Sequence, residues 1–180
     1  MKGVVFTEFL EFVEQSFDVD MVEDIITDAN LPHGGAYTAV GSYPHSEMSL
    51  LCGALAVRSG NSVSSLIQEF GHHLSTFFHE TFPEYFTQVK DFGDFLESVD
   101  QRIHVEVRKL YPDAELPEIE VLERTPEHLR LVYRSSRHLS DLAIGLIEQA
   151  ATYFGTRATV TVEGDPGPED NEIYLLVSTS

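Results

Sequence analysis

Hydrophobic residues recur at helical spacing through the first 110 residues of the chain. Between Lys2 and Phe17 the apolar side chains lie three or four positions apart with acidic residues between them, which predicts a first helix. Capping residues at the start and glycine, proline or asparagine at the end predict further helices. These run from Asp18 or Asp20 to Asn30, from Ser46 to Ser59, from Ser62 to about Thr81, and from Asp91 to Leu110. The stretch 31–44, rich in glycine and proline, is expected to be a loop.

After residue 117 the pattern changes to an alternation of apolar and polar positions, which is typical of half-buried strands. Four strands are expected: Glu118–Arg124, His128–Tyr133, Arg157–Val162 and Glu172–Val177. The first two strands are expected to form a hairpin. A helix over His138–Phe154 follows them, with Gly155 as its C-cap. An acidic turn over residues 164–168 joins the last two strands. This order predicts an α+β domain with a small antiparallel sheet at its C-terminal end. No linker is visible, so residues 1–180 are expected to form one domain.

Composition narrows the class of protein. A length of 180 residues with 42% hydrophobic residues is enough for one domain that buries its own core. No apolar run approaches the ~20 residues of a membrane span, and Glu8 and Glu11 interrupt the first apolar stretch, which argues against a signal peptide. Cys52 is the only cysteine, so an intrachain disulfide and a cysteine-based zinc site are excluded, and a cytoplasmic location is expected.

The charge is strongly acidic and unevenly placed. Thirty acidic residues against eleven basic ones give a net charge of −19, which would repel nucleic acid and anionic membranes. Seven of the bases fall in one segment: Arg102, Arg108, Lys109, Arg124, Arg130, Arg134 and Arg137. An anionic ligand would bind near this segment. The alternative is that these bases form ion pairs with neighbouring acids such as Glu106 and Glu127.

Motifs for enzymatic chemistry are lacking. No glycine-rich phosphate loop follows a predicted strand, and no nucleophile elbow is present. Glu69 and His72 have the i, i+3 spacing of di-iron bundle proteins, but no second Glu-x-x-His occurs. His73 and His79 lie on the same predicted helix. A metal could bind these histidines, and solvated surface side chains are the alternative.

Two further features are candidates for ligand binding. At about 100° per residue, His104 lies roughly 115° from the centre of the apolar stripe of its helix, at the rim of a buried face. It is either a structural histidine or a side chain that meets a flat ligand lying against the helix. In an extended segment, Tyr133, Ser135 and Arg137 point to one face and could receive carboxylates, which arginine binds bidentately. An edge strand with ordinary polar groups is the alternative.

These residues resemble the haem nitric oxide/oxygen binding (H-NOX) family, which includes the sensor domain of soluble guanylate cyclase. The resemblance rests on Ile103–Pro112, which contains His104, and on the Tyr-x-Ser-x-Arg motif that ends at Arg137. It extends over nearly the whole chain through the segments 1–5, 35–38, 41–44 and 145–148. The family has an α+β fold in which a helical N-terminal part packs on a four-stranded antiparallel sheet with helices, and haem lies buried between them.

The resemblance implies a role for each matching residue. His104 corresponds to the proximal ligand of haem b, and Pro117 to a proline that presses on the porphyrin. The three residues of the Tyr-x-Ser-x-Arg motif, Tyr133, Ser135 and Arg137, correspond to the group that binds the haem propionates. Four further residues would form an apolar distal wall: Val5, Phe78, Leu142 and Leu146.

Departures from the family pattern bear on the gas that is sensed. Oxygen-binding members have a distal tyrosine where this chain has Leu142, and the supporting polar positions are Phe9 and Leu74. Bound oxygen needs a hydrogen-bond donor, whereas NO binds ferrous haem strongly without one. The resemblance therefore implies a sensor of NO that also binds CO and excludes oxygen. Residues 164–171 contain no cysteine, so the zinc or oxidation sensing of some members is not expected.

The implied function is that of a stand-alone, non-enzymatic, cytoplasmic sensor. NO would weaken the iron–histidine bond, and release of His104 would shift the helical part against the sheet. The signal would pass to a separate partner, because no effector domain follows Ser180. The resemblance implies a histidine kinase or a cyclic-di-GMP enzyme as this partner. The alternatives are a haem carrier without signalling and a non-haem di-iron type metalloenzyme built around Glu69, His72 and His79.

Overall fold

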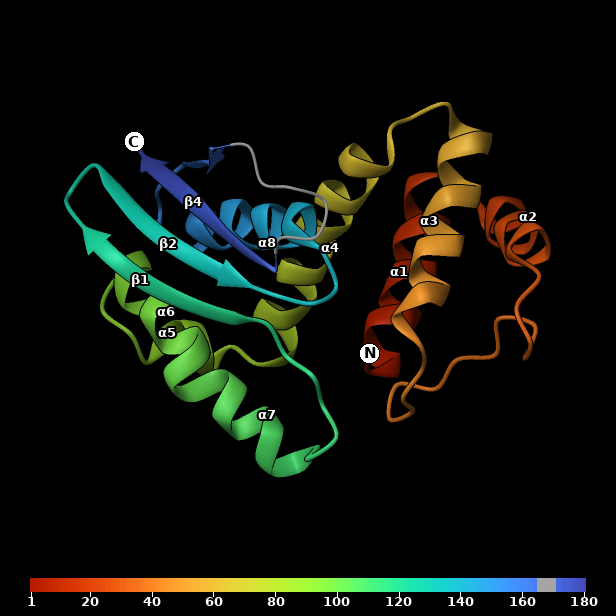
Figure 1. The fold of residues 1–180 in the computed structure, drawn as a ribbon, viewed down its shortest axis with the longest axis horizontal. Coiled ribbons are helices and arrows are strands. Elements are labelled where there is room, and N and C mark those ends of the chain that lie inside the picture. The colour runs from red at the N-terminus through yellow and green to blue at the C-terminus, as the bar shows by residue number, and fades with distance from the viewer. Residues whose placement is uncertain (165–170) are drawn as a thin grey trace.

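The N-terminal part of the computed structural model, which describes residues 1–164 and 171–180, is helical (Figure 1). Its helices are α1 (Gly3–Ser16), α2 (Val19–Ala29), α3 (His45–Ser59) and α4 (Val63–Thr81). Asp18 caps α2 by accepting a hydrogen bond from the Met21 amide at 2.8 Å, and Ser62 caps α4 in the same way through the Ser65 amide at 3.1 Å. The predicted helices are confirmed with bounds that differ by one or two residues.

The helices α1 to α4 enclose a first hydrophobic cluster. Phe6, Phe9 and Val13 of α1, Leu51 and Leu55 of α3, and Leu66 of α4 are fully buried in it. The named residues of α1 and those of α3 are three or four positions apart, so each of these two helices turns one apolar face to the same core. Burial of these side chains is the main stabilising contribution to this part of the chain.

The segment that was predicted as one long helix consists of several pieces. A short helix α5 (Glu84–Thr87), absent from the prediction, precedes α6 (Phe92–Ser98). A π-helical turn η1 (Val99–Ile103) then joins α6 to α7 (His104–Leu110). A π turn holds one residue more than an α turn, so the helical period of the sequence breaks at this point.

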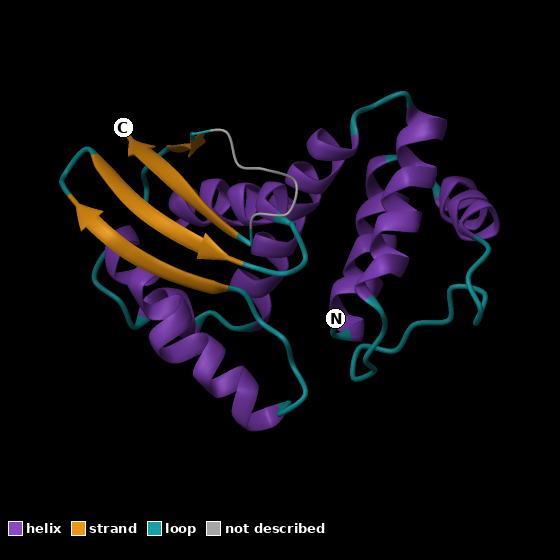
Figure 2. Ribbon diagram, viewed as in Figure 1, coloured by secondary structure: helices purple, strands orange, loops and turns teal. Residues whose placement is uncertain are grey.

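The C-terminal part is a four-stranded antiparallel sheet, as predicted (Figure 2). Its strands are β1 (Glu118–Arg124), β2 (His128–Arg134), β3 (Ala158–Glu163) and β4 (Glu172–Thr179), in the order β1-β2-β4-β3. Helix α8 (Ser140–Tyr153) packs with α6 against one face of this sheet around a second hydrophobic cluster. Most of the predicted turn 164–168 lies outside the described residues.

Helix α4 connects the two parts by crossing α8 at very short range. A Cβ atom on Gly145 would lie 2.0 Å from the Gln68 carbonyl oxygen, and one on Gly71 would lie 2.6 Å from the Leu142 carbonyl oxygen. The backbones of the two helices are therefore in direct contact, and neither position has room for a side chain. This crossing sets the position of the helical part on the sheet part (Figure 1).

Gly145→Ala is expected to destabilise the protein by about 1–3 kcal/mol, because its methyl group would meet backbone that cannot swing aside. Gly53→Ala is the matched control, since Gly53 also lies within a helix and a Cβ atom there meets nothing within 4 Å. That change should raise the free energy of unfolding by about 0.5–1 kcal/mol. Urea denaturation measures both values. Equal effects of the two substitutions would show that the crossing is not tightly packed.

In the part of the chain that the structure describes, no single helix is long and apolar enough to cross a membrane; only α3 and α4 taken together meet the length and composition criteria, and they are bent by 112° relative to each other.

Candidate functional site

His104 is the first residue of α7 and directly follows the π turn. Its Nδ1 atom lies 3.1 Å from Oδ1 of Asp100, one turn earlier, and its side chain is 13% exposed. Burial lowers the pKa of His104, while the hydrogen bond with Asp100 and the nearby Pro117 carbonyl act in the opposite direction. At neutral pH the ring is therefore largely the neutral imidazole, which is the form that ligates metals.

Because of the π turn, the orientation of His104 differs from the predicted one. An extra residue in one turn rotates everything after it back by up to about 100°. His104 thereby moves from the rim of the apolar face toward its centre. Leu110, which was predicted to lie in the apolar stripe, rotates outward instead and is 74% exposed.

Tyr133, Ser135 and Arg137 are brought together, but by a turn rather than by strand alternation. Strand β2 ends at Arg134, and the Ser135 hydroxyl accepts a hydrogen bond from the Arg137 amide at 3.2 Å. Tyr133 is 5% exposed. Burial raises the pKa of Tyr133, and the neighbouring Ser135 hydroxyl and the positive charge of Arg137 act in the opposite direction. The three residues are thus neighbours, although Arg137 lies in the turn after β2 and not on the strand face, and its guanidinium extends to Glu115.

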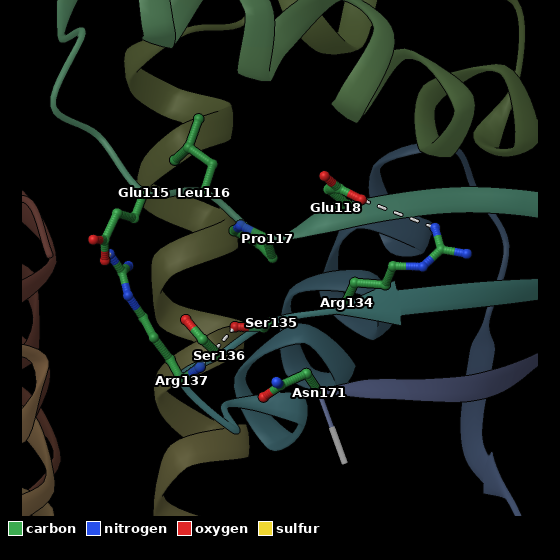
Figure 3. Close-up of a pocket in the computed structure, with 9 residues that line it drawn as sticks. All are labelled: Glu115, Leu116, Pro117, Glu118, Arg134, Ser135, Ser136, Arg137 and Asn171. Carbon is green, nitrogen blue, oxygen red and sulfur yellow. Dashed lines mark hydrogen bonds and ion pairs between the residues drawn. The ribbon is translucent and has the colours of Figure 1, made fainter. Parts of the chain in front are cut away.

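A pocket of about 240 Å³ opens beside these residues (Figure 3). It is lined by residues 115–118, 134–137 and Asn171. The Arg137 side chain is only 12% exposed, yet its Nη2 atom lies 3.1 Å from Oε2 of Glu115, which is 79% exposed. A nearly buried guanidinium is therefore already presented to a carboxylate. Arg134 extends away from Arg137 (Figure 3) and pairs instead with Glu172, at 2.6 Å.

Four residues were predicted to form an apolar wall: Val5, Phe78, Leu142 and Leu146. All of them are partly buried and pack against the N-terminal hydrophobic cluster. Phe78 also packs against the C-terminal cluster, so it lies where the two parts of the molecule meet. Phe9 and Leu74 are buried in the same cluster, with exposed fractions of 0% and 2%.

The histidines of α4 serve separate contacts rather than a common metal site. His72 lies 3.3 Å from Glu148 of α8, His73 lies 3.3 Å from Glu8 of α1, and the His79 ring stacks on Tyr153 at 3.8 Å. Among residues 1–164 and 171–180, no group of three or more His, Cys, Asp or Glu side chains is arranged to hold a metal ion. The predicted di-iron alternative therefore has no support from this geometry.

Two residues near the site were missed by sequence reasoning. Asp100 lies four residues before His104, a spacing that places both side chains on one helix face and could have indicated the contact. Glu115 lies in the loop between α7 and β1. No pattern in the sequence indicates its pairing with Arg137, because that contact depends on the turn after β2.

Comparison with known proteins assigns the chain to a family. The family model described as "Haem-NO-binding" matches residues 2–162. The structure is similar to that of the Fe(II) unliganded H-NOX protein from K. algicida, with 35% sequence identity and a TM-score of 0.92 over 100% of this chain and 97% of that chain. It is also similar to the H-NOX from Shewanella woodyi in the Fe(II)CO ligation state, with 33% identity and a TM-score of 0.83 over 99% of this chain and 94% of that chain.

A curated relative is soluble guanylate cyclase 89Db of Drosophila melanogaster, which is 24% identical over 168 residues. The match includes 90% of this chain and 24% of the relative, so the chain spans about a quarter of that protein's length. The family model covers nearly the whole chain, and the fold is the predicted α+β arrangement. The chain therefore belongs to the haem-NO-binding (H-NOX) family, whose domains bind haem and sense gases.

Proposed function

We propose that this chain is a single haem b-binding domain that senses NO, with His104 as the protein ligand of the iron. The observation that carries the proposal is a pair of nearly buried groups: the imidazole of His104, positioned by Asp100, and Arg137, which already binds a carboxylate. Pro117 links them, because it lies near His104 and lines the pocket beside Arg137. Haem needs both of these, because its iron takes an axial imidazole and its two propionates are anions.

The residues present fit this cofactor. The hydrogen bond between Nδ1 and Asp100 leaves the other ring nitrogen, Nε2, as the atom that would ligate the iron. Tyr133 and Ser135 lie beside Arg137 and would add hydroxyl donors for the propionates. Pro117 borders the same pocket and lies near His104, where it would press on one face of the porphyrin.

When bound, haem would supply an iron that binds a diatomic gas, and His104 would be the residue that holds the iron. The chain would position this group and exclude water from it by the apolar side chains of Val5, Phe78, Leu142 and Leu146. His104 would hold α7 to the iron until NO weakens that bond. Release of His104 would then allow α7 to move. NO would in this way shift the equilibrium between two positions of α7, because it favours the one in which His104 is released.

The output would pass to a separate protein, and a histidine kinase or a cyclic-di-GMP enzyme is the class of partner that we propose. Membership in a family of sensor domains supports a non-catalytic role. We also propose a reducing, cytoplasmic setting, supported by the single cysteine, Cys52, which is buried. A kinase or cyclic-nucleotide assay with candidate partners, with and without NO, distinguishes a sensor from a haem carrier.

The first experiment is an absorption spectrum of the purified protein. We expect an intense Soret band, and we expect NO and CO each to change the spectrum of the reduced form. Absence of a Soret band after reconstitution with haem would contradict the proposal.

The reduced wild-type protein is expected to show no lasting spectral change in air, because the distal wall offers no hydrogen-bond donor. Leu142→Tyr would place a phenol in that wall. A net hydrogen-bond contribution of about 0.5–1.5 kcal/mol corresponds to an increase in oxygen affinity of up to about tenfold. The gain is limited because Phe9 and Leu74 cannot orient the new hydroxyl. Leu122→Tyr is the matched control, because Leu122 is an exposed residue of β1 outside the wall.

A lasting oxygen spectrum of the wild-type protein would contradict the NO-selective interpretation and leave the assignment of haem intact. An equal effect of Leu142→Tyr and Leu122→Tyr would show that position 142 has no special relation to the bound gas.

A further inference from the structure

The start of α1 and the loop that follows α2 form one rigid unit. The Gly3 amide donates to the Gly41 carbonyl at 2.8 Å, and the Val4 amide donates to the Ala39 carbonyl at 2.9 Å. The Tyr43 amide donates to the Met1 carbonyl at 2.9 Å. Lys2 therefore belongs to a segment in which residues 1–5 and 38–43 move together.

The residues after α7 form a second rigid unit. The Tyr111 amide donates to the Val107 carbonyl at 2.8 Å, which closes the helix, and the Ala114 amide donates to the Tyr111 carbonyl at 2.9 Å. Asp113 lies inside this turn. A displacement of α7, which begins at His104, must therefore carry Asp113 with it.

Side chains join the two units at one point. Lys2 Nζ lies 2.9 Å and 3.0 Å from the two carboxylate oxygens of Asp113 and 2.9 Å from the Ser42 hydroxyl. The Ser42 hydroxyl donates to Asp113 Oδ2 at 2.8 Å. Lys2 Nζ also lies 4.6 Å from the centre of the Tyr111 ring, within the range of a cation–π interaction.

The surroundings make this more than an isolated surface ion pair. The Lys2 side chain is 15% exposed, because its stem lies against other groups while its ammonium reaches Asp113. The contacts with Lys2 and then Ser42 hold the pKa of Asp113 below its usual value. The carboxylate therefore stays charged and the three polar groups form a closed network, which is stronger than a single exposed pair.

We propose that Lys2, Ser42, Tyr111 and Asp113 form a clasp that transmits movement of the His104 helix to α1. Helix α1 packs mainly against α2 and α4, whereas α7 continues from η1, so the clasp supplies a direct link between them. Val5, of the proposed distal wall, lies one turn after Lys2. The inference rests on the proposed function, because the displacement of α7 is expected to start from the release of His104.

Hydrogen exchange measured by mass spectrometry tests the clasp in the haem-loaded, reduced protein with and without NO. Asp113→Asn and Lys2→Met remove one charge each with little change of shape. Asp24→Asn is the matched control, because Asp24 also forms a solvent-exposed ion pair, with Arg58, but inside the N-terminal helices. Their absorption spectra establish that all variants contain haem and bind NO.

In the wild-type protein NO is expected to change exchange in residues 104–114 and also in residues 1–5 and 38–43. Both clasp variants should keep the NO-induced change in exchange of residues 104–114. In residues 1–5 and 38–43 this change should be about two- to fivefold smaller than in the wild-type protein. The double variant should reduce the NO-induced change in exchange no further than either single variant, because each single substitution already removes the same link. Asp24→Asn should leave all responses as in the wild type.

An undiminished response of residues 1–5 and 38–43 in the clasp variants would overturn the proposal, as would a wild-type protein in which these segments do not respond to NO. Both results leave the proposed gas binding untouched. A protein that takes up no haem would instead overturn the proposed function, and the transmission role with it, and the absorption spectrum identifies that case.

Discussion

His104→Gly is expected to remove the protein ligand of the iron and so to change the spectrum of the reduced, haem-loaded protein completely. The reason is that His104 is the imidazole which the π turn directs inward, and Asp100 holds its Nδ1 atom at 3.1 Å. Glycine leaves a space of about the size of the lost ring. Added imidazole should occupy this space and restore a spectrum close to that of the wild type.

His128→Gly is the matched control, because His128 lies in the β1–β2 hairpin and bonds with Thr125 there. Its reduced spectrum should be that of the wild-type protein. A wild-type spectrum for His104→Gly without imidazole would show that another residue ligates the iron. Circular dichroism of both variants separates loss of the ligand from loss of the fold.

Arg137→Ala is expected to accelerate loss of haem by about ten- to a hundredfold, which corresponds to the removal of one charge-assisted hydrogen bond of ~1.5–3 kcal/mol. The Arg137 side chain is nearly buried and lines the pocket, and its guanidinium lies against the Glu115 carboxylate (Figure 3). Transfer of haem to an excess of apomyoglobin measures the rate.

The matched control for this change is Arg134→Ala. Arg134 borders the same pocket, but its guanidinium points outward to Glu120 and Glu172. Its removal should change the rate of haem loss by less than about twofold, because pairs on the surface contribute little. Equal rates of haem loss for the two variants would show that the group of Tyr133, Ser135 and Arg137 does not contribute to haem binding.

The helices and strands could be predicted largely from sequence, because their signals are local. The bounds of β1 coincide with the prediction, since alternation and the flanking turn residues define a strand. Asp18 and Ser62 act as the caps that their positions indicated. The four residues of α5 were missed because a single turn is too short to show a helical period.

The parts of the site that were mispredicted depend on tertiary structure. Nothing in the local sequence marks the π turn Val99–Ile103, so periodicity placed His104 at a rim and Leu110 in the core. The pairing of Arg137 with Glu115 likewise depends on how the turn after β2 meets the loop before β1. The ligand role of His104 came from a family resemblance rather than from spacing, and it remains a prediction.

The resonance Raman spectrum of the reduced protein tests the central claim most directly, because its iron–histidine stretching band reports the bond from His104. We expect this band to be present in the wild-type protein, to be absent from His104→Gly, and to disappear from the wild-type spectrum when NO is added. A band that persists in the presence of NO would contradict the release of His104, and a band retained in His104→Gly would contradict its role as the ligand.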